Sequence, residues 1–170
     1  MITIIDLDMG NSRSIYNMLH RLGFKSEITR EKNKIIQSNK IILPGVGSFD
    51  KAIENLDKFE LKEILSQKAL VEKIPFLGIC LGMQMLTNSS EEGSLPGLGW
   101  IEGHAIKFKA NNEIKVPHMG WNYVEIYNHG ELTINLNESS RFYFVHSYYV
   151  RVKDERHSIM KTNYSTQFDS

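Results

Sequence analysis

A single cysteine, Cys80, lies between two glycines in the segment FLGICLGMQML. A nucleophile on a sharp strand-to-helix turn needs small neighbours, because the backbone there packs closely on adjoining elements, and Gly78 and Gly82 meet that need. At a helix N-terminus the unpaired N–H groups favour a thiolate, and the N–H of Leu81 can point at an oxyanion. The pattern therefore predicts a cysteine nucleophile, although a lone cysteine is more commonly a small buried apolar residue.

A second glycine loop, Pro44 to Gly47, follows an apolar run that begins at Lys40. Alone, this segment could be only a tight turn. Because it follows a predicted strand and its glycines let a peptide reorient, we interpret it as the source of a second oxyanion donor.

Short strands and helices that would position these loops alternate along the first half of the chain. Apolar runs at 2–7, 40–47 and 74–79 predict buried strands, and helical spacing of apolar residues predicts helices after each run. Asn11 or Ser12 can cap the first helix and Gly23 can stop it. This alternation predicts a parallel sheet covered on both faces, with ligands at the carboxyl ends of the strands, where all three glycine loops fall.

From about Ser89 the sequence becomes rich in β-branched and aromatic residues. We expect largely antiparallel strands, continuing or flanking the sheet, in the segments GLGWIEGHAIKFK, NYVEIY, LTINL and RFYFVHSYYVRV. The tail SIMKTNYSTQFDS predicts one more strand followed by a loop.

Composition indicates one domain, residues 1–170, with 41% hydrophobic and 24% charged residues. Twenty basic residues balance twenty acidic ones, so we expect no nucleic acid or membrane partner, but rather a small molecule or another protein. The N-terminus shows neither a signal peptide nor a membrane span, and one cysteine suits a reducing cytoplasm. We expect no metal and no cofactor.

Four segments, ILPGVGSFD, PFLGICLGMQML, KVPHMGWN and RFYFVHSYY, carry a resemblance that spans the chain. Together they resemble the glutaminase subunits of imidazole glycerol phosphate synthase, which are class I (triad) glutamine amidotransferases. The resemblance implies a flavodoxin-like α/β fold with a mixed, mainly parallel sheet and helices on both faces. It also implies that Cys80 attacks the side-chain amide of glutamine, forms a thioester and releases ammonia to a synthase (cyclase) subunit in a heterodimer.

The same resemblance assigns further residues. Backbone N–H groups of Leu81 and, after a peptide flip, of Val46 or Gly47 would hold the oxyanion. Residues matching the substrate-binding positions are Gly45, Gln84, Ser147 and Tyr148. Those matching the partner interface and ammonia path are Asn11, Pro117, Met119, Trp121, Asn122 and Tyr143. Without the family pattern, Gln84 reads as a solvated helix residue and Ser147 as a residue that satisfies a strand edge.

A cysteine hydrolase also needs a base and a group that orients the base. The family carries both in a Gln-Phe-His-Pro-Glu motif, and none of the six histidines here is followed by Pro-Glu. His146 is a tempting substitute, but the family keeps a histidine there in addition to the triad histidine. We therefore expect the chain to be C-terminally incomplete, lacking the last strand and helix, with an exposed strand edge. Since general-base assistance is worth roughly 100 to 10,000-fold, turnover should be severely impaired.

The sequence departs from the family pattern at two adjacent residues, and three alternative functions are also considered. Leu7 and Asp8 replace a tyrosine and a glycine of the family pattern, which puts the shape of the first loop in question. The ammonia acceptor could instead be a surface-polysaccharide sugar that receives an amidine, as in a paralogous amidotransferase. The chain could also be a non-catalytic truncated scaffold. A stand-alone cysteine hydrolase is disfavoured because such an enzyme does not require the KVPHMGWN cluster.

Overall fold

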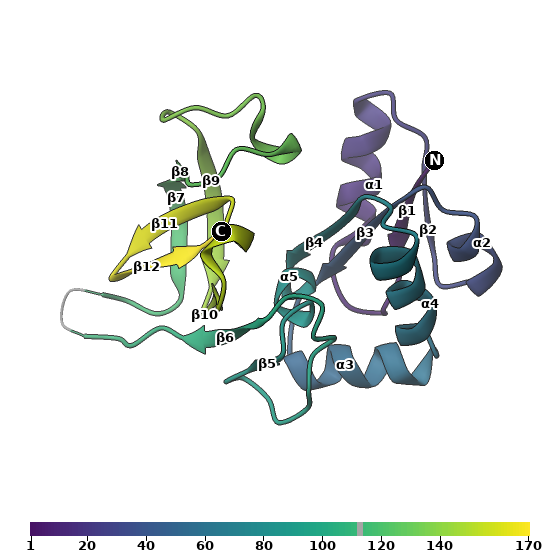
Figure 1. Cartoon of the computed structure of the whole chain (residues 1–170), viewed down its shortest axis with the longest axis horizontal. Coiled ribbons are helices and arrows are strands. Elements are labelled where there is room, and N and C mark those ends of the chain that lie inside the picture. The colour runs from purple at the N-terminus through teal and green to yellow at the C-terminus, as the bar shows by residue number, and fades with distance from the viewer. Residues whose placement is uncertain (112–113) are drawn as a thin grey trace.

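The computed structural model describes residues 1–111 and 114–170. The first half of the chain forms a four-stranded parallel sheet in the order β2-β1-β3-β4, on the right in Figure 1. Its elements are β1 (Ile2–Ile5), α1 (Ser12–Arg21), β2 (Ser26–Thr29), α2 (Lys32–Ile36), β3 (Lys40–Gly45), α3 (Phe49–Lys58), α4 (Lys62–Ser66), a π-helical turn (Gln67–Val71), β4 (Phe76–Cys80) and α5 (Leu81–Met85). The predicted parallel strands and helices are confirmed. The additional strand β2 has one buried side chain, Thr29, and so lacks the apolar run that predicts the others.

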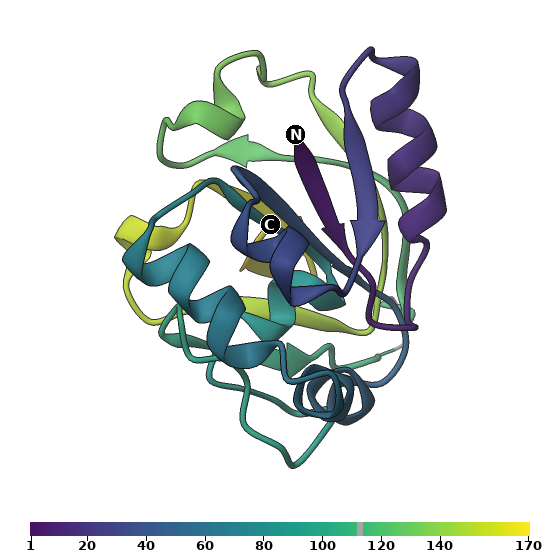
Figure 2. The same ribbon diagram turned by 90° about the vertical axis from the view of Figure 1, so that its right-hand side faces the viewer.

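Side chains of the central strands alternate between two cores, as the pleat of a strand requires. Ile5 and Leu43 belong to a core shared with α2, α3, α4 and α5. Ile4 and Ile42 belong to a smaller core with residues of α1. Figure 2 shows α1, in purple, across the strands from the other helices. The prediction of helices on both faces is therefore confirmed.

The first helix begins and ends where the sequence predicts. The Asn11 side chain accepts a hydrogen bond from the backbone N–H of Ser14, which satisfies one of the free N–H groups of the first turn. Gly23 follows the helix with φ of +80°, a conformation that glycine adopts without strain.

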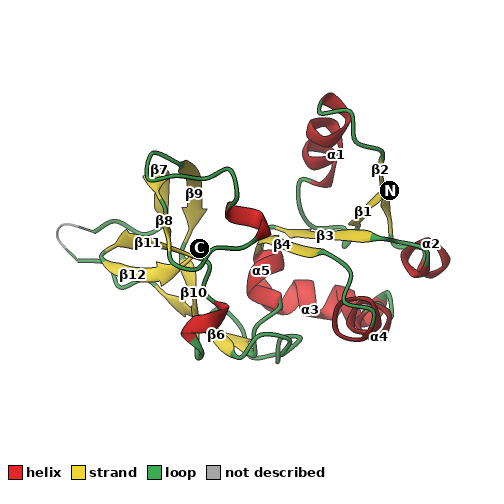
Figure 3. Ribbon diagram, turned by 45° about the horizontal axis from the view of Figure 1, so that its top comes forward, coloured by secondary structure: helices red, strands yellow, loops and turns green. Residues whose placement is uncertain are grey.

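The second half forms a six-stranded sheet, in the order β5-β6-β10-β12-β11-β8, and a separate antiparallel pair, β7-β9 (Figure 3). Its strands are β5 (Ser89–Ser90), β6 (Gly103–Lys107), β7 (His118–Tyr123), β8 (Glu125–Ile126), β9 (Arg141–His146), β10 (Tyr148–Val152), β11 (Met160–Tyr164) and β12 (Thr166–Asp169). Pairing is antiparallel except between β5 and β6. These strands flank the parallel sheet and do not extend it.

Two strand predictions in this half are wrong. The segment LTINL lies in a 3-10 turn (Glu131–Thr133) and the loop after it, and its apolar Leu132 and Ile134 are exposed, so alternating apolar residues find no core. The tail forms two strands, not one. The hairpin turns at Ser165, whose φ is +58°.

The outer strand of the parallel sheet, β4, pairs with β3 alone among the described strands. Leu77 of β4 lies 37% exposed. The structure thus leaves one strand edge and part of a sheet face open beside Cys80. Within the described ranges, no helix has both the length and the apolar character needed to cross a bilayer.

Candidate active site

The turn between β4 and α5 holds Cys80 in a strained conformation. Its φ is +55° and its ψ is −115°, values that a residue with a side chain adopts only when its surroundings enforce them. A Cβ added to Gly82 would lie 1.8 Å from the carbonyl oxygen of Leu43, and one added to Gly78 would lie 2.7 Å from the Met83 nitrogen. Both flanking glycines are therefore required by close backbone contact.

The second glycine loop lies directly beside this turn. Gly45 pairs with Cys80 in the register of β3 and β4, so Val46 and Gly47 continue past the sulfur at the carboxyl end of the sheet. Gly47 has a φ of +99°, which suits a loop that must reorient a peptide. The second loop therefore begins beside Cys80, but Val46, Gly47 and Leu81 are not among the described residues that line the cavity next to the sulfur.

The electrostatics of the thiol differ from the expectation. Burial by surrounding protein atoms raises the pKa of the Cys80 thiol, although part of the residue is exposed to solvent. A hydrogen bond from the Leu81 N–H lowers the pKa, and the charge of Glu92 raises it. Burial is the largest of these effects and outweighs the hydrogen bond from Leu81 at the start of α5. The turn positions the sulfur, while its surroundings raise the pKa of the thiol.

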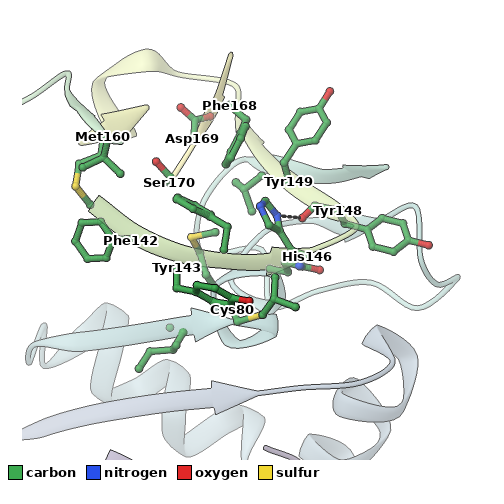
Figure 4. A pocket seen from close by; sticks show the side chains of 18 residues that line it. Cys80, Phe142, Tyr143, His146, Tyr148, Tyr149, Met160, Phe168, Asp169 and Ser170 are labelled. Carbon is green, nitrogen blue, oxygen red and sulfur yellow. Dashed lines mark hydrogen bonds between the residues drawn. The ribbon is translucent and has the colours of Figure 1, made fainter. Parts of the chain in front are cut away.

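A largely apolar cavity of about 320 Å³ lies between the open edge of β4 and strand β9. Figure 4 shows Cys80 and Tyr143 beside each other at one side of the cavity. Gln84 also lines it and is buried, so its interpretation as a solvated helix residue is wrong. Its side-chain oxygen has no hydrogen-bond partner among the described residues, and such a buried acceptor is costly unless a ligand satisfies it.

Ser147 forms the break between β9 and β10, and Tyr148 is the first residue of β10. Tyr148 lines the cavity, and its carbonyl oxygen accepts a hydrogen bond from His146. The carbonyl oxygen of Ser147 accepts a hydrogen bond from the backbone N–H of Phe108. Ser147 therefore satisfies a strand edge, as expected without the family pattern. Its neighbour Tyr148 is the residue of this segment that lines the cavity.

His146 lines the cavity but has no free nitrogen to act as a base. Its Nδ1 lies 2.8 Å from the Tyr148 carbonyl oxygen, and its Nε2 lies 2.9 Å from Nδ1 of His118. No other histidine is among the residues that line this cavity in the described structure. The geometry agrees with the expectation that His146 is not the base.

The β7-β9 pair presents exposed aromatic residues from the predicted interface. Trp121 and Tyr143 are paired across the strands, with ring centroids 5.8 Å apart in an edge-to-face arrangement. Met119 is exposed on the same strand as Trp121, and Pro117 precedes it in the exposed turn. Asn122 also serves the fold, because its amide donates to the carbonyl oxygen of Asn163.

The first glycine loop lies against the second. A Cβ on Gly10 would approach the Cα of Gly45 to 3.5 Å, which places the loop before Asn11 beside the predicted oxyanion loop. Asp8, the departure from the family pattern, has a φ of +56°, and its carboxylate accepts hydrogen bonds from Arg30. Arg30 also donates to Asp6. These ion pairs hold the first loop, in which Asp8 stands where the family pattern has a glycine.

Sequence reasoning missed Glu92. Its carboxylate accepts a hydrogen bond of 3.0 Å from the backbone N–H of Phe49, at the start of α3. Asp50 of α3 accepts hydrogen bonds from the backbone N–H groups of Ser94 and Leu95, so the loop and the start of α3 are joined by hydrogen bonds in both directions. The only sequence signal is the acidic pair in SSEEG, which resembles an ordinary solvated loop.

No group of three His, Cys, Asp or Glu side chains in the described ranges could hold a metal ion. The site combines a cysteine on a strained strand-to-helix turn, a second glycine loop beside it, a largely apolar cavity lined by Gln84, and Glu92, whose charge acts on the thiol. This arrangement suits acyl transfer from an amide.

Comparison with known proteins agrees with this chemistry. Residues 3–169 match the family model described as glutamine amidotransferase class-I. Over 170 residues the chain is 53% identical to imidazole glycerol phosphate synthase subunit HisH 2 of Methanococcus maripaludis, covering 100% of this chain and 84% of that protein. It is 44% identical over 168 residues to HisH 2 of Pseudomonas aeruginosa, covering 99% of this chain and 83% of that protein. A solved glutamine amidotransferase structure shares the fold, with a TM-score of 0.71 at 15% identity, over 99% of this chain and 87% of that one. The chain therefore belongs to the class-I glutamine amidotransferase family.

Proposed function

We propose that this chain is a glutaminase subunit in which Cys80 attacks the side-chain amide carbon of glutamine. The N–H groups of Leu81 and of Val46 or Gly47 stabilise the oxyanion. Collapse of the intermediate breaks the C–N bond, releases ammonia and leaves a thioester, which water hydrolyses to glutamate and free thiol. The observation that carries this proposal is the pairing of Gly45 with Cys80, which supports a second oxyanion donor from the loop that follows Gly45.

The amino-acid end of glutamine needs partners for an ammonium and a carboxylate. Gln84 offers an unpaired buried oxygen, and Glu92 carries a negative charge close enough to affect the Cys80 thiol. Both suit the ammonium group. The Ser147–Tyr148 segment, with Tyr148 in the cavity, is our assignment for the carboxylate end.

We assign the ammonia acceptor to a synthase subunit that docks on the exposed face of β7 and β9. Trp121 is 67% exposed and Met119 61% exposed, and such an apolar face is typical of a protein interface. Tyr143 lies on this face and also lines the cavity, which makes it the start of the ammonia path in this proposal. Relatives named as imidazole glycerol phosphate synthase subunits favour the histidine pathway over a polysaccharide sugar. The complex would be a cytoplasmic heterodimer.

Turnover also requires a base. Because burial raises the pKa of the Cys80 thiol and both ring nitrogens of His146 are hydrogen-bonded, we propose that the base arrives on a further strand. That strand would pair with the open edge of β4 and carry the histidine and glutamate of the family motif. In this proposal residues 1–170 form one incomplete amidotransferase domain.

Ammonia release from glutamine tests the proposal. We would assay the 170-residue chain alone, with a synthase subunit, and with an added segment containing the His-Pro-Glu motif, using Cys80→Ala as the control. We expect near-background release from the chain with its partner and restored release when the segment is added. Partner-stimulated turnover of about 1 per second or more without the segment would overturn the missing-base argument. Partner binding with no restored release would favour the scaffold alternative, and rapid release without any partner would favour a stand-alone hydrolase.

A further inference from the structure

Two histidines face each other across the β7-β9 pair, close to the cavity but outside the machinery assigned above. His118 and His146 are register partners, and His118 Nδ1 lies 2.9 Å from His146 Nε2. His118 is only 3% exposed. Its ring stacks on Tyr164, with centroids 3.9 Å apart, and on Phe144 at 4.9 Å. Such packing holds the ring in one orientation.

The two histidines belong to a chain of hydrogen bonds. The backbone carbonyl groups at its two ends determine which ring nitrogen of each histidine carries the proton. The Tyr148 carbonyl can only accept, so His146 Nδ1 donates to it, as the dashed line in Figure 4 marks. A neutral His146 then accepts at Nε2, so His118 donates from Nδ1. His118 Nε2 is left to accept from the Asn122 amide at 3.4 Å.

The orientation of Asn122 is determined in the same way. Its nitrogen donates to the Asn163 carbonyl oxygen, and its own oxygen accepts from the Tyr123 N–H. Only the nitrogen can therefore face His118. One continuous hydrogen-bond chain leads from the Asn122 amide through both rings to the carbonyl of Tyr148, with both rings neutral. Consistently, burial lowers the pKa of both histidines.

We propose that His118 and His146 are positioning residues for glutamine, acting through the peptide at Tyr148. The inference rests on the function proposed above, in which the Ser147–Tyr148 segment receives the amino-acid end of the substrate. His146 ties the carbonyl of Tyr148 and shapes the break between β9 and β10. His118 acts one step further away, because its Nδ1–H keeps His146 in the tautomer that can donate to that carbonyl.

Removal of the His118 donor should disturb this segment without touching Cys80. His146 would then have an unpaired Nε2 and could rotate or change tautomer, since a buried polar group without a partner is unfavourable. The Tyr148 carbonyl would lose its donor, and the segment that contacts substrate would shift. The strained turn at Cys80 belongs to the other sheet and keeps its own contacts.

Two substitutions at His118 separate hydrogen bonding from packing. His118→Phe keeps an aromatic ring that can stack on Tyr164 and Phe144 but removes the donor. His118→Asn loses the ring but places an amide N–H close to the former position of Nδ1. A purely structural role predicts that the Phe variant is the better tolerated of the two, whereas the positioning role predicts the opposite order for glutamine recognition.

The assay measures alkylation of Cys80 by two reagents and needs no turnover. A chloroketone analogue of glutamine retains the amino-acid end, and the sulfur displaces its chloride to form a C–S bond. Iodoacetamide reacts by the same displacement, with loss of iodide, but has no amino-acid end. For His118→Phe we expect the second-order rate with the chloroketone to fall by about tenfold or more, as small misplacements of bound groups do. We expect the iodoacetamide rate to stay unchanged, and His118→Asn to stay near wild type with both reagents.

Each result decides the matter. Equal chloroketone rates in wild type and His118→Phe would overturn the inference while leaving the proposed function standing. An Asn variant as impaired as the Phe variant would also overturn it, because the donor would then not be the cause. If wild-type labelling by the chloroketone neither saturates nor is slowed by glutamine, the proposed function fails and the inference fails with it.

Discussion

Acid should destabilise this protein through His118 in a way that one substitution can isolate. Burial, and secondly the electrostatic interaction with His146, lowers the pKa of His118 from 6.5 to about 4. Between these values the unfolded chain binds a proton that the folded chain does not. The stability contributed by the neutral ring is therefore fully present above pH 6.5 and is lost progressively as the pH falls toward 4.

The size of the effect follows from the two pKa values. Proton linkage between pH 7 and pH 5 gives a loss of about 2 kcal/mol in the free energy of unfolding for this single group. The value is an upper bound, because Tyr164, which stacks on the ring, is only partly buried and lets water approach. His146, whose pKa burial also lowers, contributes in the same direction.

Urea unfolding at pH 7 and pH 5, followed by tryptophan fluorescence and circular dichroism, provides the measurement. We would compare wild type with His118→Phe, which cannot titrate, and with His129→Phe, a change at an exposed histidine. Wild type and the His129 variant should lose up to about 2 kcal/mol more than His118→Phe between the two pH values. An equal loss in all three proteins would refute the assignment of a buried neutral His118.

Three further substitutions test the site. Glu92→Gln should shift the pH midpoint for iodoacetamide alkylation of Cys80 downward, because it removes a charge that raises the thiol pKa. Gly82→Ala should destabilise the fold by about 3 kcal/mol or more, measured by urea unfolding, because its Cβ would meet the carbonyl oxygen of Leu43 at 1.8 Å. Trp121→Ala should weaken synthase binding by more than about 1 kcal/mol in a calorimetric titration if Trp121 anchors the interface.

Each of these has a control elsewhere in the chain. Glu91→Gln changes the neighbouring acid, and a midpoint shift as large as that of Glu92→Gln would remove the special role of Glu92. Gly130→Ala adds a Cβ where nothing lies within 4 Å, so equal destabilisation would contradict the contact argument. Phe24→Ala removes an exposed aromatic residue next to α1 and β2, and an equal loss of affinity would show that Trp121 is not a specific anchor.

The sequence alone was sufficient to predict those features of the fold that depend on neighbouring residues. The turn at Cys80, the cap at Asn11 and the buried strands β1, β3 and β4 could each be predicted, because each depends on a few neighbouring residues or on a continuous apolar run. The parallel sheet followed from the alternation of strands and helices. Family resemblance added glutamine as the expected substrate, the substrate-binding positions and the face expected to bind a partner.

Tertiary structure decided what depends on residues far apart in the chain. The charge of Glu92 acts on Cys80 only because the loop after β5, in one sheet, packs near the turn after β4, in the other sheet. The two histidines are paired only because β7 and β9 are neighbours, and their protonation is set by groups that no spacing rule connects. The raised pKa of the Cys80 thiol likewise reflects burial by surrounding atoms. Burial and long-range pairing are properties of the packed chain, so they are absent from any short stretch of its sequence.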